Sequence, residues 1–286
     1  MTTAPQAVIA LDHCAALGER PLYEPAEDAL YWVDSLAPSI NRLSLRSGEN
    51  HCWPLPRRIG TFALKAGGGA VLALDDGVYD FAFDDGPPVP RVRLDFAPQA
   101  FLNDGRCDPQ GRFWVSSALA EGHVYRLDAS GLRPLIDGVA VGNGMAWSPD
   151  GRTMYVGCCL TGRVWQFDYD RLTGTPTNRR LFVSAGGNGV FLDGAAVDSE
   201  GGYWLCLCGA GRIERFLPDG THDRSVTLPS KRPTMLAFGG PDLATAYVTT
   251  AGAEVDPSLP PPLPGDGCIL ALDLGVRGLP EPKLAS

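Results

Sequence analysis

Hydrophobic and polar residues alternate along this chain in short runs, and pairs of such runs recur six times around Gly- or Asp-rich turns. Alternation with a period of two predicts β-strands, and each pair predicts a hairpin. The first strand of each pair is centred on one bulky residue, namely Trp32, Leu72, Trp114, Tyr155, Trp204 or Tyr247. The separations of 40, 42, 41, 49 and 43 residues between these positions are typical of β-propeller blades.

No helical period persists along the chain, so we expect an all-β fold, a six-bladed β-propeller formed as one domain over residues 1–286. The segment 7–12 has no hairpin partner, and we expect it to pair with the last blade and close the ring, because an unpaired edge strand promotes aggregation. The Pro-rich segment 256–267 cannot form a strand ladder. It is predicted to be a surface loop, either a plain connector or a wall of the channel mouth. The predicted hairpin strands are 30–35 with 40–45, 70–76 with 77–83, 111–117 with 122–128, 152–159 with 162–170, 202–208 with 211–216, and 245–251 with 268–274.

The strand before each hairpin is expected to be the innermost of its blade and to begin at one mouth of the central channel. Counting back 11 to 13 residues from each bulky residue reaches equivalent positions that carry Glu, Thr, Asn, Asn, Asp and Thr. None of the six is Lys, Arg or aliphatic. These positions are Glu19, Thr61, Asn103, Asn143, Asp193 and Thr234.

Two carboxylates and two amides around one axis predict a metal site formed by Glu19, Asn103, Asn143 and Asp193. Oxygen ligands of this kind favour Ca²⁺, with Mg²⁺, Mn²⁺ or Zn²⁺ as alternatives. Asn-Gly and Asp-Gly are also common turn dipeptides. The shared register favours a site over simple turns, because Glu19 occupies the same position without a following Gly.

Composition narrows the possible partners. The net charge of −9 disfavours nucleic acid and anionic membrane surfaces as partners. The N-terminus resembles no signal peptide, and no apolar run reaches the roughly 18 residues that a membrane span needs. We therefore expect a cytoplasmic protein, a monomer or small homo-oligomer, whose eight cysteines are reduced thiols.

The channel residues lie in motifs that resemble the SMP-30/gluconolactonase/regucalcin family. The resemblance implies a six-bladed propeller that hydrolyses sugar lactones with one divalent cation. It implies Glu19, Asn143 and Asp193 as metal ligands, and Asn103 as a contact to the metal or the substrate. The motifs include GERPLYEP (18–25), NDGRCDPQGRFW (103–114), NGMAWSPDG (143–151) and LDGAAVDSEGGYW (192–204).

Three departures from the family pattern concern the expected substrate site. Arg20 replaces a Gly, Phe101 stands where the family has a substrate-binding Arg, and Met235 replaces a Ser or Cys. We expect these residues to contact substrate together with Asn103, and His123 to reach the mouth from the third hairpin. The loss of a charged donor and the gain of Phe101 and Met235 predict a less polar pocket and a neutral, partly apolar or deoxygenated lactone.

The resemblance implies that the cation polarises the lactone carbonyl while a water attacks it. Asp193 is the first candidate for the general base, and Asp104 is the alternative. A Gly-x-Ser-x-Gly elbow is missing from the sequence, which disfavours a serine hydrolase. Two other functions remain open: a metal-dependent esterase or phosphotriesterase on the same scaffold, and a non-catalytic propeller that binds metal and ligand.

Overall fold

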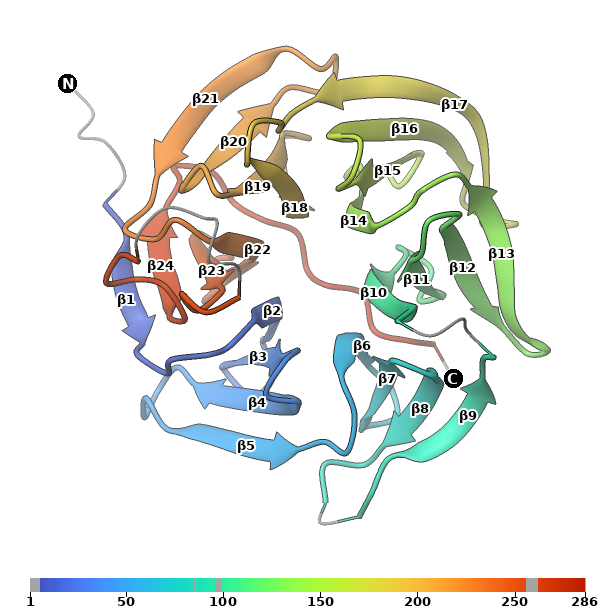
Figure 1. Cartoon of the computed structure of the whole chain (residues 1–286), viewed down its shortest axis with the longest axis horizontal. Coiled ribbons are helices and arrows are strands. Elements are labelled where there is room, and N and C mark those ends of the chain that lie inside the picture. Colours follow the sequence, from blue (N-terminus) through green and yellow to red (C-terminus); the bar gives the residue numbers. More distant parts are fainter. Residues whose placement is uncertain (1–5, 85, 96–98, 256–261, 286) are drawn as a thin grey trace.

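The computed structural model describes residues 6–84, 86–95, 99–255 and 262–285. Its strands form six four-stranded antiparallel sheets arranged as blades around one axis (Figure 1). This confirms the predicted all-β, six-bladed propeller. The described part of the chain has no helix, and so none with the length and apolar character needed to span a membrane.

Each blade begins at the axis and proceeds outward in chain order. Blades one to five consist of β2–β5, β6–β9, β10–β13, β14–β17 and β18–β21, and blade six contains β22–β24 with β1. The innermost strands are β2 (Gly18–Glu24), β6 (Ile59–Leu64), β10 (Phe101–Cys107), β14 (Gly142–Trp147), β18 (Phe191–Val197) and β22 (Pro233–Gly239). The second strands are β3 (Ala29–Asp34), β7 (Ala70–Leu74), β11 (Phe113–Ala118), β15 (Thr153–Cys158), β19 (Tyr203–Cys208) and β23 (Thr245–Thr250).

The third and outermost strands complete the blades. The third strands are β4 (Ser39–Ser44), β8 (Gly77–Phe81), β12 (His123–Asp128), β16 (Arg163–Asp170), β20 (Arg212–Phe216) and β24 (Ile269–Asp273). The outermost strands are β5 (Asn50–Pro54), β9 (Val89–Arg93), β13 (Gly131–Asp137), β17 (Thr175–Ser184) and β21 (His222–Thr227). The hairpin pattern did not reveal these outer strands, because they are mostly exposed and carry polar residues and Pro rather than a clean alternation.

The outermost place in blade six belongs to β1 (Val8–Leu11), which pairs antiparallel with β24. Val8 lies opposite Ala271, and Leu11 lies opposite Ile269. The two ends of the ring are therefore joined by backbone hydrogen bonds, and the predicted closure by segment 7–12 is confirmed.

The hydrophobic core lies between the blades. Each of the six buried clusters combines residues of two neighbouring sheets; blades three and four, for example, share a cluster that contains Trp114 and Met154. A buried Asp in the turn before a second strand fixes some of these aromatics. Asp198 accepts hydrogen bonds from the backbone N–H of Gly202 at 2.8 Å and from Trp204 Nε1 at 2.8 Å. This arrangement explains why Asp and Trp recur six residues apart, in Asp108 with Trp114 and in Asp198 with Trp204.

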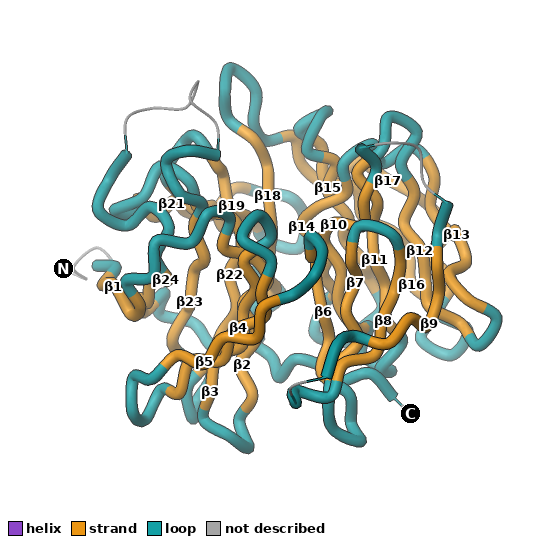
Figure 2. Tube along the Cα trace, turned by 60° about the horizontal axis from the view of Figure 1, so that its bottom comes forward, coloured by secondary structure: helices purple, strands orange, loops and turns teal. Residues whose placement is uncertain are grey.

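The loops gather at the two ends of the strands (Figure 2), and the segment 275–285 crosses one of these ends. This segment, called the strap here, passes over the axis from β24 to blade two (Figure 1). Leu284 pairs with Lys65, and the backbone N–H of Ala285 donates to Gly111 O at 2.9 Å. The strap therefore covers the mouth at which the innermost strands end, called the strap mouth. The sequence pattern did not predict it.

Candidate functional site

The opposite mouth, where the innermost strands begin, holds the four predicted oxygen donors and is called the oxygen mouth. Glu19, Asn103, Asn143 and Asp193 lie near the starts of β2, β10, β14 and β18. Asn143 is buried, and the other three are partly exposed. Equivalent places in four different blades thus bring residues far apart in sequence to one opening.

A β-bulge interrupts every innermost strand at this level. The pairing register shifts between Glu19 and Leu22 in β2, between Asn143 and Ala146 in β14, and correspondingly in the other four blades. A bulge adds one residue to a strand and redirects its side chains. In β14 the bulge contains Gly144 with a φ of +60°, a conformation that favours glycine. The repeated bulge therefore helps to position the channel side chains.

The carboxylates at this mouth repel one another. Desolvation raises the pKa of Glu19 well above its usual value, and the charges of Asp193 and Asp104 add to the rise. The pKa of Asp193 is also raised well above its usual value, by desolvation first and then by Asp104. Glu19 and Asp193 therefore lie in a low-dielectric environment with the charge of Asp104 nearby, and a bound cation would stabilise their charged forms.

Hydrogen bonds orient the two amides. Asn103 Nδ2 donates to Gly142 O at 3.0 Å, which fixes the orientation of this amide. The Asn143 side chain hydrogen-bonds to Asp193 and lowers the pKa of that carboxyl, against the stronger effect of burial. Asp104 Oδ2 accepts the backbone N–H of Met145 at 2.9 Å, so Asp104 is engaged in holding the β14 bulge.

The two remaining channel positions connect neighbouring blades. Thr61 Oγ1 donates to Gly105 O at 2.6 Å, from blade two to blade three. Thr234 Oγ1 donates to Gly18 O at 2.5 Å, from blade six to blade one. Both threonines are fully buried, so their hydroxyls serve the ring rather than the opening.

The donor set at the oxygen mouth consists of oxygen only. Among the residues described, no three His, Cys, Asp or Glu side chains come together as a group that could hold a metal ion. The cluster offers instead the carboxylates of Glu19 and Asp193 beside the amides of Asn103 and Asn143. Hard cations such as Ca²⁺ take carboxylate and amide oxygens together with water. The residues present therefore fit a divalent hard cation by donor type and by charge.

The residues predicted to contact substrate have different surroundings in the structure. Arg20 is buried in a left-handed conformation, with a φ of +50°, and its guanidinium forms an ion pair with Glu281 of the strap. Met235 is buried against Gly194. His123 lies on the third strand of its blade, where Nδ1 is 2.7 Å from an Asp137 carboxylate oxygen. These three side chains are committed to protein partners, whereas Phe101 is partly exposed at the start of β10.

One residue that the motifs did not reveal is Arg58, which precedes β6. Its guanidinium carbon lies 3.5 Å from the centroid of the Phe101 ring. The charge of Arg58 also lowers the pKa of Glu19, although less than burial raises it. A cation therefore stands beside Phe101 at this mouth, and the expectation of an apolar opening at position 101 is wrong in this respect. The sequence contains no local signal for this contact. Arg57 and Arg58 are neighbours in the chain, and only the folded structure gives their side chains different surroundings.

Residues 262–267 of the Pro-rich segment lie at the same mouth, and residues 256–261 fall outside the described residues. The side chain of Asp266 is buried and forms an ion pair with Arg232 at 2.6 Å. Its Oδ1 also accepts the backbone N–H of Lys231 at 2.9 Å. Because Lys231 and Arg232 lead into β22, the described part of this segment packs beside the start of an innermost strand.

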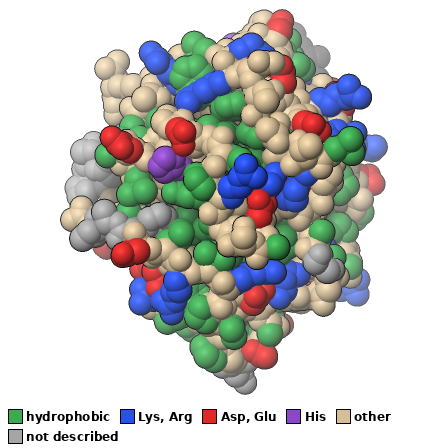
Figure 3. Space-filling view, turned by 90° about the vertical axis from the view of Figure 1, so that its right-hand side faces the viewer, with side chains coloured by type: hydrophobic (Ala, Val, Ile, Leu, Met, Phe, Trp, Pro, Cys, Tyr) green, Lys and Arg blue, Asp and Glu red, His purple; other side chains and the backbone are tan. Residues whose placement is uncertain are grey.

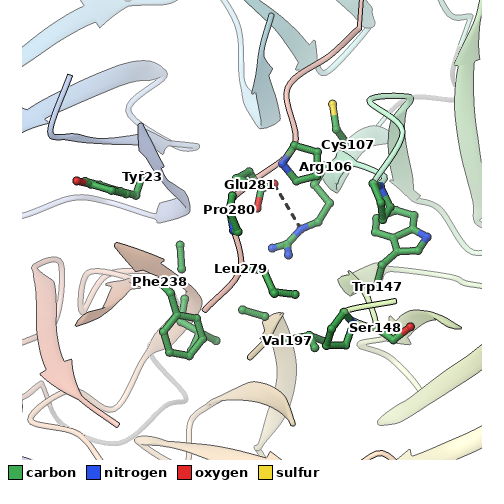
Figure 4. Close-up of a pocket in the computed structure, with 16 residues that line it drawn as sticks. Tyr23, Arg106, Cys107, Trp147, Ser148, Val197, Phe238, Leu279, Pro280 and Glu281 are labelled. Atoms are coloured by element: carbon green, nitrogen blue, oxygen red, sulfur yellow. Dashed lines mark ion pairs between the residues drawn. The ribbon is translucent and has the colours of Figure 1, made fainter. Parts of the chain in front are cut away.

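The strap mouth contains a cavity of about 290 Å³ whose lining includes Trp147, Phe238 and Leu279 (Figure 4). Glu281 lies between two buried arginines there. It forms an ion pair with Arg20, and its Oε1 is 4.0 Å from Arg106 Nε. Burial by itself would raise the pKa of Glu281, but the charges of Arg20 and Arg106 lower it. Charge at this end is thus compensated within the protein.

The outer wall of the propeller also carries compensated charge. On the face in Figure 3, Lys and Arg side chains are interspersed with Asp and Glu. Arg180 pairs with Asp168 at 2.6 Å, and Arg42 pairs with Glu27 at 2.6 Å. All eight cysteines are free thiols.

Comparisons with known proteins find relatives over nearly the whole chain. Residues 17–252 match the family model described as the SMP-30/Gluconolactonase/LRE-like region. The chain is 36% identical over 282 residues to a 6-deoxy-6-sulfogluconolactonase of Pseudomonas putida, covering 95% of this chain and 96% of the relative. It is 32% identical over 279 residues to the pentonolactonase XacC of Haloferax volcanii, covering 95% of both chains. A solved structure of the calcium-binding protein regucalcin from Agrobacterium tumefaciens superposes with a TM-score of 0.89 at 27% identity, covering 99% of this chain and 97% of that one.

Proposed function

Because this chain belongs to the SMP-30/gluconolactonase/LRE-like family, we propose that it hydrolyses a sugar-type lactone to the hydroxy acid with the help of one divalent cation. The observation that carries the proposal is the gathering of Glu19, Asp193 and two oriented amides at the oxygen mouth. The names of two relatives, a sulfogluconolactonase and a pentonolactonase, support a sugar lactone as substrate. The calcium-binding regucalcin supports a cation, with Ca²⁺ as the first candidate.

Glu19, Asn103, Asn143 and Asp193 would hold the cation. When bound, it would polarise the lactone carbonyl and stabilise the negative charge that develops on its oxygen. The residues of the chain supply the rest. Asn103 and Asn143 would contribute their side-chain oxygens, and Asp193 would accept a proton from the attacking water. Asp104, which holds the backbone of Met145, acts as a positioning residue rather than as the base.

The esterase alternative depended on an apolar opening created by Phe101. The guanidinium of Arg58 covers that ring at 3.5 Å, so this residue no longer favours an apolar ester. The non-catalytic alternative would require the oxygen cluster to serve binding only. The lactonase is the function that the charge and donor types of this mouth support best.

A pH-drop assay on a panel of sugar lactones tests the proposal. We expect the protein to open one or more of these lactones and to lose this activity in EDTA. Added Ca²⁺ is expected to restore the activity, and Mg²⁺, Mn²⁺ and Zn²⁺ are the alternatives to be compared with it. Turnover that survives complete removal of metal would reject the cation. Opening of aryl esters or phosphotriesters alone would favour the esterase, and metal binding without any hydrolysis would favour the non-catalytic propeller.

A further inference from the structure

Arg58 is a cation that the catalytic proposal leaves without a role. We propose that Arg58 binds an anionic substituent of the substrate, so that the preferred substrates are lactones that carry a carboxylate, sulfonate or phosphate group away from the scissile bond. This inference rests on the proposed lactonase function and names its substrate class.

The guanidinium of Arg58 is held in place. It stacks over the Phe101 ring at 3.5 Å from the centroid, and its Nε donates to Ser35 Oγ at 3.3 Å. An arginine has five N–H donors in a rigid planar group. Because the ring holds one face and Ser35 takes one donor, the other edge of the group remains for a ligand. Planar or tetrahedral oxyanions match that edge, since they accept paired hydrogen bonds from a guanidinium.

Arg58 also differs from its neighbour Arg57. Arg57 is exposed and pairs with Asp75 at 3.3 Å and Asp76 at 3.6 Å. Arg58 is partly buried and forms no ion pair with a carboxylate among the described residues. A partly buried cation that the charges of Glu19 and Asp75 reach only beyond ion-pair distance is incompletely compensated, and a bound anion would complete the compensation.

The electrostatics place this cation beside the reaction site. Burial lowers the pKa of Arg58, while the charges of Glu19 and Asp75 raise it, and an arginine stays protonated at any pH at which the protein works. When Glu19 is engaged with a divalent cation, its charge is no longer available to Arg58. An anionic group on the substrate would then compensate the charge of Arg58 in place of Glu19. Phe101, in the same strand as Asn103, connects the two parts of the site.

The test compares two lactones with the same ring, D-glucono-1,4-lactone and D-glucaro-1,4-lactone, which differ in a terminal hydroxymethyl or carboxylate. The holoenzyme is expected to favour the anionic lactone in kcat/KM. Hydrogen bonds to charged groups are strong enough for a preference of about 10-fold or more. Arg58→Gln should remove that preference mainly through KM, and Arg58→Lys should keep part of it because it keeps the charge. Arg57→Gln is the matched control and should leave the preference unchanged.

A binding measurement separates this inference from the lactonase itself. Calorimetry with D-glucarate, which cannot be turned over, should show binding to the wild type that weakens in Arg58→Gln and at high salt. If the protein opens no lactone, the proposed function fails, and glucarate binding alone then decides the role of Arg58. An equal loss for both lactones in Arg58→Gln, a wild type that prefers the neutral lactone, or glucarate binding unaffected by Arg58→Gln would overturn the inference.

Discussion

The two mouths of this propeller contain similar charged side chains in opposite electrostatic environments. At the oxygen mouth, Glu19 and Asp193 lie beside another carboxylate, and the pKa of each is raised. At the strap mouth, Glu281 lies between Arg20 and Arg106, and its pKa is lowered. At the oxygen mouth the charge of Arg58 only partly offsets the negative charge, whereas at the strap mouth the two arginines compensate it. Charged groups that the protein itself leaves incompletely compensated are typical of binding and catalytic sites, because a ligand can compensate them.

The strap mouth should respond most strongly in stability. Glu281→Gln leaves Arg20 and Arg106 buried without their counter-ion, and breaking a buried pair in this way costs about 3–5 kcal/mol. Urea denaturation should show this loss. Arg277→Gln removes an exposed pair with Asp242 and should change the free energy of unfolding by less than about 1 kcal/mol. Similar losses of unfolding free energy in both variants would show that the buried pair at the strap mouth stabilises the protein no more than an exposed pair.

The oxygen mouth should respond most strongly in activity. Asp193→Asn keeps the size of the side chain but removes a ligand charge and the proposed base, and it should lower lactonase kcat/KM by about 100-fold or more. Steady-state kinetics with a saturating cation measure this effect. Near-normal turnover in a folded Asp193→Asn variant would exclude Asp193 from catalysis.

The raised pKa values also predict a dependence of stability on pH. A carboxyl whose pKa is higher in the folded state contributes most below its unfolded pKa, and that contribution is lost as the pH rises through the folded pKa. In chelator, the wild type should therefore melt lower at pH 8 than at pH 5.5. Asp193→Asn should melt about 2–4 °C above the wild type at pH 8, which corresponds to about 1 kcal/mol.

Added Ca²⁺ is the control for this experiment. It should raise the melting temperature of the wild type at pH 8 and have a much smaller effect on Asp193→Asn, because the cation relieves the same repulsion that the substitution removes. Differential scanning calorimetry with and without Ca²⁺ makes the comparison. A chelated wild type that is more stable than Asp193→Asn at pH 8 would contradict the repulsion between these carboxylates.

The smallest effect concerns a channel position that is not a ligand. Thr234→Val keeps the shape but removes the hydrogen bond to Gly18 O, and it should lower the free energy of unfolding by about 1 kcal/mol. Calcium affinity measured by calorimetry should stay within about threefold of the wild type. A large loss of affinity would place Thr234 among the cation-binding residues and weaken the division between ring-connecting and ligand-binding positions.

The sequence was sufficient to predict the channel residues because the repeat is local. Strand alternation and turn residues recur with each blade, so Glu19, Asn143 and Asp193 can be aligned by counting along the chain. The outer strands were missed because they are exposed, so burial does not impose alternation on them. Arg20 was assigned to the substrate site from its position beside Glu19, but its side chain turns to the strap, which no local pattern reveals.

By itself, the sequence determined the six-fold repeat, the ring closure by 7–12 and the oxygen-bearing positions of the innermost strands, since hydrogen bonding and turn chemistry act over a few residues. Only the tertiary structure decided which charges are compensated. Glu281 meets Arg20 across the channel, and Arg58 meets the ring of Phe101 from a neighbouring blade. Such contacts depend on the closed ring, because only closure brings distant segments of the chain within reach of one another.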